Sequence, residues 1–234
     1  MTARNIWRSD RLIYRSVETT DEAFLSSLNH HGSESFQNAS PGLPVPQGPR
    51  SAVQFREFLQ SNLLGCIICL PPPEAPNEDA SNEPSSANPP TTTSDSTTNQ
   101  TKDPSTPEPQ PTPIGILHLM SADAARAHHR STELGITLHA SHQSRGYGSE
   151  AILWAAEFAF RHANLHRVAI GAFAWNERAY GLYERLGFVM EGRARECFWY
   201  DGRWEDAVSL GMLAGEWWER YGNEKRKGEQ RSLA

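Results

Sequence analysis

The feature that most constrains the fold of this chain is the glycine-containing segment 143–148, Gln-Ser-Arg-Gly-Tyr-Gly. Ahead of it, residues 133–139 alternate strictly between aliphatic and other side chains, which predicts a half-buried β-strand. Behind it, residues 149–165 keep their polar side chains on one narrow helical stripe, which predicts a mostly buried helix. A glycine turn at a helix N-terminus directs backbone N–H groups and the positive end of the helix dipole at one point. The segment therefore predicts an anion-binding turn.

Two common nucleotide-binding patterns fit this turn poorly. The P-loop pattern requires Lys followed by Ser or Thr after its second glycine, and neither follows Gly148. Gly146, Gly148 and Ala151 do fit the G-x-G-x-x-A pattern of dinucleotide-binding folds. That fold runs its strand almost directly into the first glycine and places an acidic residue about 20 positions further on. Here the polar stretch 140–145 intervenes, and the next strand ends at Trp175 without a carboxylate.

The segments after the turn predict another strand, a helix and a further strand. Residues 168–174 are continuously apolar, as in a buried strand. Asn176 has the position of an N-cap for a helix whose apolar residues recur at helical spacing as far as Leu186. Gly187 predicts the C-cap of that helix, and Phe188 begins the next strand.

Three motifs in this order resemble the GNAT (GCN5-related N-acetyltransferase) superfamily: Gln143-x-x-Gly146-x-Gly148, then Asn176, then Leu182 to Phe188 (Leu-Tyr-Glu-Arg-Leu-Gly-Phe). Residues 191–193 and 201–210 are similar to the branch that acetylates ribosomal-protein N-termini and polyamines. The resemblance covers residues 11 to about 218 apart from one insert. It implies an α/β (α+β) fold with a mixed, mostly antiparallel central sheet and helices on both faces.

The resemblance implies a single acetyltransferase domain over residues 1–234. Its core covers residues 11 to about 218, and residues 219–234 form a charged C-terminal tail. Residues 11–17 predict its first strand, and Thr19-Thr-Asp-Glu22 predicts a capping box that opens a helix to about residue 29. A second helix is expected over 52–60. The intervening loop, residues 30–50, is expected to border the acceptor site.

Residues 71–113 differ in composition from the rest of the chain. They contain twelve of the sixteen prolines and seven acids against one lysine, a net charge of −6 that equals that of the whole chain. Such a segment has too little apolar surface to offset its ordering entropy, so we predict a disordered acidic insert. It joins two predicted strands, 63–70 and 114–120, that would otherwise form an antiparallel hairpin.

The resemblance also implies acetyl-CoA as co-substrate and a set of residues that bind it. The strand before the turn would lie beside the pantetheine arm, with a backbone N–H that polarises the thioester. Asn176 matches the residue that binds the pantetheine arm, and Tyr183 matches the tyrosine that gives a proton to the thiolate. The predicted cofactor-binding residues are Ile136, Thr137, Leu138, Gln143, Ser144, Arg145, Gly146, Tyr147, Gly148, Ser149, Asn176 and Tyr183. The alternative for Tyr183 is a core aromatic residue.

Glu133 is the candidate general base, because it opens its strand on the face opposite the aliphatic row and can point into an acceptor cleft. The alternative is a solvated carboxylate at a strand end. His128, His129 and His139 are further candidates, although the adjacent pair lies in a polar turn. No spacing of carboxylates and histidines indicates a metal site. Cys66 and Cys69 are expected to be buried residues on opposite faces of a strand.

The favoured class is an N-acetyltransferase, and the alternative is a catalytically silent acyl-CoA-binding or scaffold protein of the same fold. The expected partners are acetyl-CoA and an amine acceptor, a small amine, a polyamine or a protein N-terminus, with a homodimer left open. The longest apolar run, 63–70, is far shorter than the ~20 residues of a membrane span. We therefore expect no membrane as partner. The N-terminus has no apolar h-region of a secretory signal, so we expect an intracellular location in the cytoplasm or nucleus. No nucleic acid is expected as partner.

Overall fold

The computed structural model of the chain describes residues 5–28, 40, 42–43, 45–72 and 110–222. Most of the predicted insert therefore lies outside the described residues, as do the tail beyond residue 222 and most of the loop at 30–50.

Seven strands form one sheet in the order β1-β2-β3-β4-β5-β7-β6. β4 and β5 run parallel, and the other neighbouring pairs run antiparallel. The prediction of a mixed, mostly antiparallel sheet is confirmed. The strands are β1 (Ile13–Arg15), β2 (Leu64–Leu70), β3 (Thr112–Leu119), β4 (Ser131–Leu138), β5 (Arg167–Phe173), β6 (Val189–Tyr200) and β7 (Arg203–Leu213).

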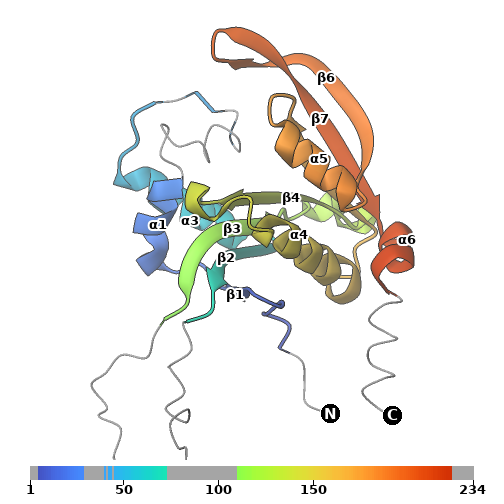
Figure 1. Cartoon of the computed structure of the whole chain (residues 1–234), viewed down its shortest axis with the longest axis horizontal. Helices are drawn as coiled ribbons and strands as arrows, with labels where there is room; N and C mark the ends of the chain where they lie inside the picture. The colour runs from blue at the N-terminus through green and yellow to red at the C-terminus, as the bar shows by residue number, and fades with distance from the viewer. Residues whose placement is uncertain (1–4, 29–39, 41, 44, 73–109, 223–234) are drawn as a thin grey trace, which may run out of the picture.

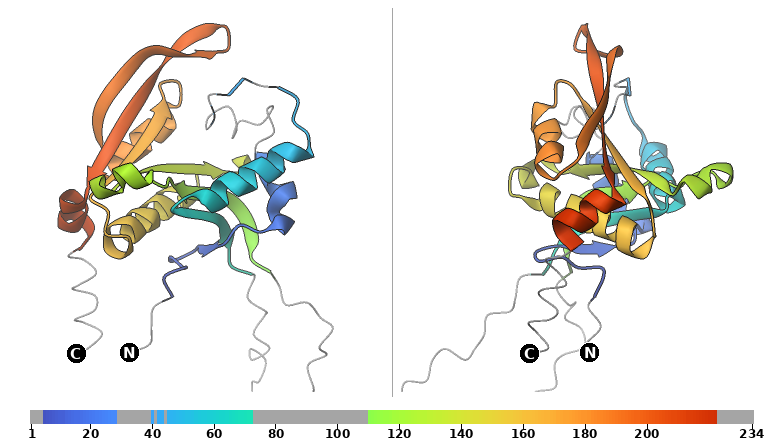
Figure 2. Two further views of the ribbon diagram at one scale, coloured as in Figure 1. Left: turned by 180° about the vertical axis from the view of Figure 1, so that it is seen from behind. Right: turned by 90° about the vertical axis from the view of Figure 1, so that its right-hand side faces the viewer.

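Helices cover both faces of this sheet (Figure 1). On one face, α1 (Glu22–Leu28) and α3 (Pro49–Ser61) enclose a small apolar cluster with side chains of β2 and β3. On the other, a larger cluster joins the sheet to α4 (Tyr147–Glu157), α5 (Glu177–Arg185) and α6 (Ala214–Trp217). Figure 2 shows the same arrangement of sheet and helices from behind and from the side. Cys66 and Cys69 are buried in different clusters, which confirms that they face opposite sides of β2.

Several predicted boundaries differ from the structure: β1 is shorter than the predicted strand 11–17, and α3 is longer than the predicted helix 52–60. The capping box lies one residue earlier than predicted, from Glu18 to Asp21, and opens a 3₁₀ turn that precedes α1. The Asp21 carboxylate accepts the Glu18 N–H at 2.9 Å and also pairs with Arg15. β3 begins two residues earlier than predicted, because Pro113 sits at a bulge of the β2–β3 ladder, where a missing N–H is tolerated. The predicted helix 149–165 begins at Tyr147, and after Glu157 it continues as a π-helical turn, residues 158–162.

The feature of the sheet that creates the site is a gap between its two parallel strands. Their pairing stops at Leu134↔Ile170, although β4 continues to Leu138 and β5 to Phe173. Beyond that point the two strands separate, and α5 follows β5 beside the opening. The β6–β7 hairpin, which turns at Asp201-Gly202, extends past the same edge (Figure 1).

Candidate active site

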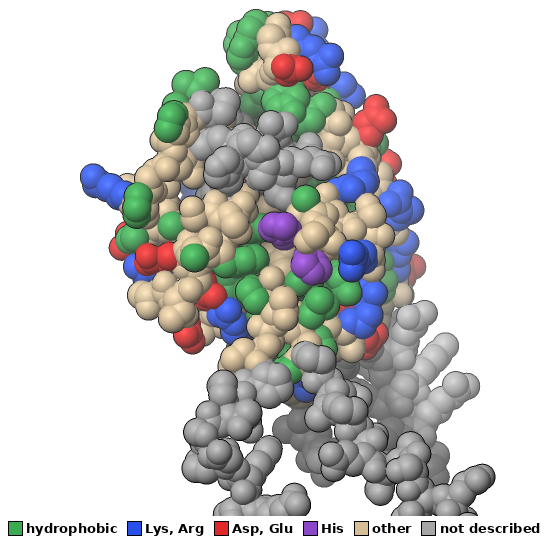
Figure 3. Space-filling model, turned by 60° about the vertical axis from the view of Figure 1, so that its left-hand side comes forward, with side chains coloured by type: hydrophobic (Ala, Val, Ile, Leu, Met, Phe, Trp, Pro, Cys, Tyr) green, Lys and Arg blue, Asp and Glu red, His purple; other side chains and the backbone are tan. Residues whose placement is uncertain are grey.

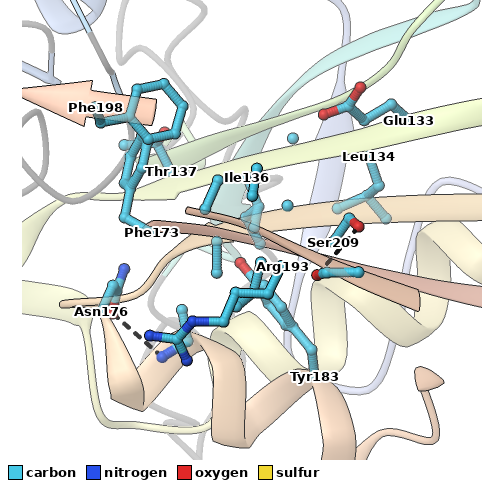
Figure 4. Close-up of a pocket in the computed structure, with 18 of the residues that line it drawn as sticks. Glu133, Leu134, Ile136, Thr137, Phe173, Asn176, Tyr183, Arg193, Phe198 and Ser209 are labelled. Carbon is cyan, nitrogen blue, oxygen red and sulfur yellow. Dashed lines mark hydrogen bonds between the residues drawn. The ribbon is translucent and has the colours of Figure 1, made fainter. Parts of the chain in front are cut away.

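Two cavities lie beside the gap between β4 and β5. The first, about 690 Å³, is lined by residues 133–137 of β4 and by Ala179 and Tyr183 of α5. Strands β3, β5, β6 and β7 complete its walls, and Phe173 and Phe198 meet edge to face there with ring centroids 5.0 Å apart. Figure 4 shows the two rings on one side of this cavity and Glu133 at its rim.

The second cavity, about 390 Å³, lies between the end of β4, the start of α4 and α5. Ten of the twelve predicted cofactor-binding residues line it: Ile136, Thr137, Leu138, Gln143, Ser144, Gly146, Gly148, Ser149, Asn176 and Tyr183. The two cavities adjoin, because both are lined by the same five residues: Ile136, Thr137, Asn176, Ala179 and Tyr183. A molecule in one cavity can therefore touch a molecule in the other at Tyr183.

The glycine turn is held in place from two sides. Gly146 is the N-cap of α4 with φ +81°, in the left-handed region that favours glycine. From the N-terminal side, Arg11 donates to the Arg145 carbonyl at 3.1 Å and pairs with Glu150 at 2.8 Å. From α5, Arg178 donates to the Ser144 hydroxyl at 3.0 Å. The first N–H groups of α4 have no partner within the helix, and this support fixes where they point.

Glu150 is the anchor of this arrangement on α4. It accepts hydrogen bonds from the Ser9 hydroxyl at 2.6 Å and from the Arg11 backbone N–H at 2.7 Å. Burial alone would raise the pKa of Glu150, but the hydrogen bonds from Ser9 and Arg11 outweigh burial and lower it. Glu150 therefore stays ionised and keeps its partners at neutral pH.

Tyr183 lies on α5 at the junction of the two cavities, with 7% of its surface exposed. Burial raises its pKa to about 12, since a phenolate would lose its hydration there. The hydroxyl is therefore protonated at neutral pH, which suits a proton donor. Its ring packs against Phe188, with centroids 6.3 Å apart, so the side chain belongs to the core as well as to the site.

Glu133 is exposed at the rim of the first cavity, at the start of the gap between β4 and β5. It leans over β5, where a Cβ on Gly171 would lie 3.8 Å from its Oε1. The absence of a side chain on Gly171 leaves the space beside the carboxylate open. Within hydrogen-bonding reach of a bound amine, a carboxylate in this place could accept a proton.

Asn176 caps α5, as predicted: its side-chain oxygen accepts the Ala179 N–H at 3.2 Å. The C-cap of the same helix is Leu186, and Gly187 follows it with φ +90°, so the helix ends at the predicted glycine, one residue after the cap. The cap sets the direction in which α5 leaves the gap, and with it the position of Tyr183. The pantetheine contact expected of Asn176 stays a prediction.

Five predicted or considered residues lie outside both cavities. Tyr147 starts α4 with its ring under the Arg11 guanidinium, 4.8 Å from centroid to Cζ, and Arg145 offers its carbonyl to the same arginine. His128 and His129 are exposed in a 3₁₀ turn, residues 124–129.

His139 also lies outside the cavities. Its Nδ1 is 2.8 Å from the Ser141 hydroxyl, an interaction within the loop that precedes the glycine turn. None of the three histidines considered as bases lines the cavity that holds Glu133.

The sequence reasoning missed several lining residues. Arg178 and Arg185 line the second cavity from α5, where a seven-residue spacing places them on one helical face. Arg193 and His118 line the first cavity. A histidine inside the otherwise apolar strand 114–120 was a signal that could have been followed.

Two structural findings bear on other kinds of site. Within the described residues, no three or more His, Cys, Asp or Glu side chains form a group that could hold a metal ion. None of the helices in the described ranges is long and apolar enough to cross a membrane.

Comparison with protein families identifies the class to which this fold and site belong. The family model of the acetyltransferase (GNAT) domain matches residues 11–189, which is more than half of the chain. The chain therefore belongs to the GNAT acetyltransferase family, as the sequence motifs indicated.

Individual relatives agree with this family. The chain is 32% identical over 107 residues to the spermidine N(1)-acetyltransferase of Vibrio cholerae, covering 46% of the chain and 60% of that protein. It is 28% identical over 104 residues to the ribosomal protein uS5 alanine N-acetyltransferase of Escherichia coli, covering 44% and 53%. The matches thus span a little over half the length of these relatives.

Solved structures share the fold across nearly the whole molecule. The crystal structure of spermidine N-acetyltransferase from Vibrio cholerae in complex with CoA and spermine matches with a TM-score of 0.63 at 20% identity. The match covers 89% of this chain and 99% of that one. A GNAT-family acetyltransferase from Bacillus anthracis matches with a TM-score of 0.59 at 16% identity, over 89% and 98%. At these identities the likeness concerns the fold.

Proposed function

We propose that the protein is an acetyl-CoA-dependent N-acetyltransferase that moves an acetyl group to a primary amine by direct attack in a ternary complex. The observation behind this proposal is the pair of adjoining cavities beside the gap between β4 and β5, which share Tyr183. One cavity would hold acetyl-CoA and the other the amine.

The second cavity has the features that a CoA substrate requires. The pyrophosphate of CoA would lie against the N–H groups at the start of α4, where Gly146 adopts the left-handed conformation. Arg178 and Arg185 supply positive charge from α5. The turn residues Arg145 and Tyr147 would serve by shaping the turn, since Arg11 contacts both.

The thioester end would lie along β4 after its separation from β5. Ile136, Thr137 and Leu138 line the cavity there, and a backbone N–H aimed at the thioester oxygen would stabilise the charge that develops on it. Asn176, beside the same stretch, would contact the pantetheine arm.

The transfer itself needs two proton movements. In the proposed reaction, Glu133 accepts a proton from the ammonium form of the acceptor, directly or through water, and releases it to solvent. The amine nitrogen then forms its bond to the acetyl carbon, the carbon–sulfur bond breaks, and the Tyr183 hydroxyl gives its proton to the departing thiolate. The second proton of the nitrogen restores Tyr183, so the net products are an acetamide, CoA thiol and one proton.

The acceptor class is supported by the relatives, whose names include both spermidine and a ribosomal-protein alanine. Both are primary amines, and both classes are retained here. Thiol release from acetyl-CoA should therefore be measured against spermidine, amino acids, aminoglycosides and peptides with a free N-terminus. Amine-dependent release with a mass gain of one acetyl group on the amine is the expected result. Tight CoA binding without release for any amine would favour the silent acyl-CoA-binding protein instead.

A further inference from the structure

His118 lies in the wall of the first cavity, on β3 and outside the motifs that define the family. In the β3–β4 ladder it is paired with Gly135, two residues beyond Glu133 on the same face of β4. His118 and Glu133 are therefore diagonal neighbours across the two strands, about 7 to 8 Å apart at Cα by general sheet geometry. Both residues line the first cavity.

The imidazole is fixed in this position by its neighbours. A Cβ on Gly135 would lie 2.2 Å from Cε1 and 2.5 Å from Nε2 of His118, so the ring occupies the space that any other residue at 135 would fill. On its other side, Phe58 of α3 contacts the ring edge to face at 5.2 Å between centroids. The ring thus has little freedom to turn away from the cavity wall.

One polar atom of this ring, Nδ1, is buried and has no hydrogen-bond partner within the described part of the fold. Burial lowers the pKa of His118 to about 4, so the ring is neutral at pH 7 and has a lone pair to offer. A buried polar atom without a partner destabilises a fold, and a bound ligand or an ordered water can supply that partner.

The rest of the first cavity suits an acceptor with one ammonium group beside apolar atoms. Glu133 is the one carboxylate among its described lining residues. The lining cation, Arg193, donates to Asp206 at 2.6 Å. Phe173 and Phe198 supply apolar surface. Figure 3 shows one face of the molecule, on which hydrophobic, charged and other polar side chains are mixed.

We propose that His118 binds the acceptor, accepting a hydrogen bond from the same amine nitrogen that Glu133 faces, and so directs the nitrogen lone pair toward the thioester. This inference rests on the proposed function, since it assigns the first cavity to the amine. His118 acts as a neutral hydrogen-bond acceptor, and Glu133 takes the proton.

The first test reads binding without requiring transfer. Protein labelled with ¹⁵N at histidine, saturated with CoA, is titrated at pH 7.5 with 2-phenylethylamine, spermidine and a tripeptide that begins with alanine. The His118 ring signals, assigned by their loss in His118→Phe, should shift with at least one amine. Those of exposed His166 should not. Unchanged His118 signals with all three amines would overturn the proposal, whereas absent transfer with shifted signals would overturn the proposed function alone.

The second test separates recognition from packing. His118→Phe keeps a ring against Phe58 and removes both nitrogens, so it should raise the KM for the amine about tenfold or more and leave the KM for acetyl-CoA unchanged. The same substitution should raise the melting temperature, because the unpartnered atom is gone. His118→Asn should recover part of the amine affinity, and His166→Phe should change neither KM. A lower melting temperature with an unchanged amine KM would show that His118 is structural and would overturn the proposal.

Discussion

Gly146→Ala tests whether the glycine turn binds the CoA phosphates, and the chain provides a matched control in Gly202→Ala. Both glycines have a left-handed backbone conformation, with φ of +81° at Gly146 and +80° at Gly202. A Cβ at Gly202 would meet nothing within 4 Å. At Gly146 the nearest atom would be Nη2 of Arg11 at 3.1 Å, the end of a flexible side chain. A left-handed alanine costs about 1 to 2 kcal/mol at either position. The two variants should therefore lose similar stability, equivalent to about 2 to 4 °C in Tm for each kcal/mol.

Their affinities for acetyl-CoA should differ. Relaxing the strain at Gly146 moves the N–H groups at the start of α4, and losing one hydrogen bond to a charged phosphate costs about 1.5 to 3 kcal/mol. That loss weakens binding by about 10- to 150-fold, while Gly202, in the β6–β7 turn, should leave it within about twofold. Isothermal titration calorimetry on both folded variants measures the difference. Equal acetyl-CoA affinity in Gly146→Ala and Gly202→Ala would refute the assignment of this turn to the phosphates.

Further predictions concern the proton transfers and the insert. Glu133→Gln should lower kcat by about 10²-fold at neutral pH with acyl-CoA affinity kept, and the loss should shrink as pH approaches the pKa of the amine; a raised amine KM with unchanged kcat would assign Glu133 to attraction alone. Tyr183→Phe should lower kcat by about 10²-fold with little change in the KM for acetyl-CoA, and wild-type turnover in this variant would make Tyr183 structural. Because burial raises the pKa of Tyr183 to about 12, a pH profile of kcat should show no loss of the proton donor up to about pH 11, whereas a decline centred at pH 10 would indicate an ordinary tyrosine. Replacing residues 74–110 by a short Gly-Ser turn should preserve Tm and CoA affinity, since Leu70 and Thr112 are already paired neighbours; a large loss in either would show that the segment contributes to the domain.

Local patterns in the sequence predicted the parts of the site that depend on local backbone. The glycine turn, the Asn176 cap and the Gly187 stop each need a particular residue type at one position, so they can be read without knowing the rest of the fold. The alternation of β4 predicted which side of that strand Glu133 would occupy. Ten of the residues assigned to the cofactor line one cavity, because they lie on these same locally predicted segments.

The parts that were missed depend on contacts between distant segments. Glu150 was assigned to a polar stripe, but it holds Ser9 and Arg11, about 140 positions away, and no periodicity reports such a pairing. His118 enters the first cavity through the β3–β4 register, which places it over Gly135. The capping box was misplaced by one residue for a similar reason. The Asp21 side chain that completes it is also bound by Arg15, a contact that the local sequence pattern does not report.

The central claim is that acetyl-CoA and the amine are bound together and react directly at Tyr183. Initial velocities measured over a matrix of acetyl-CoA and amine concentrations, with the best acceptor from the amine panel, test it most directly. Direct attack in a ternary complex predicts double-reciprocal lines that intersect, and Tyr183→Phe should keep that pattern at lower kcat. Parallel lines would show that the acetyl group is first transferred to the protein, and they would contradict the account.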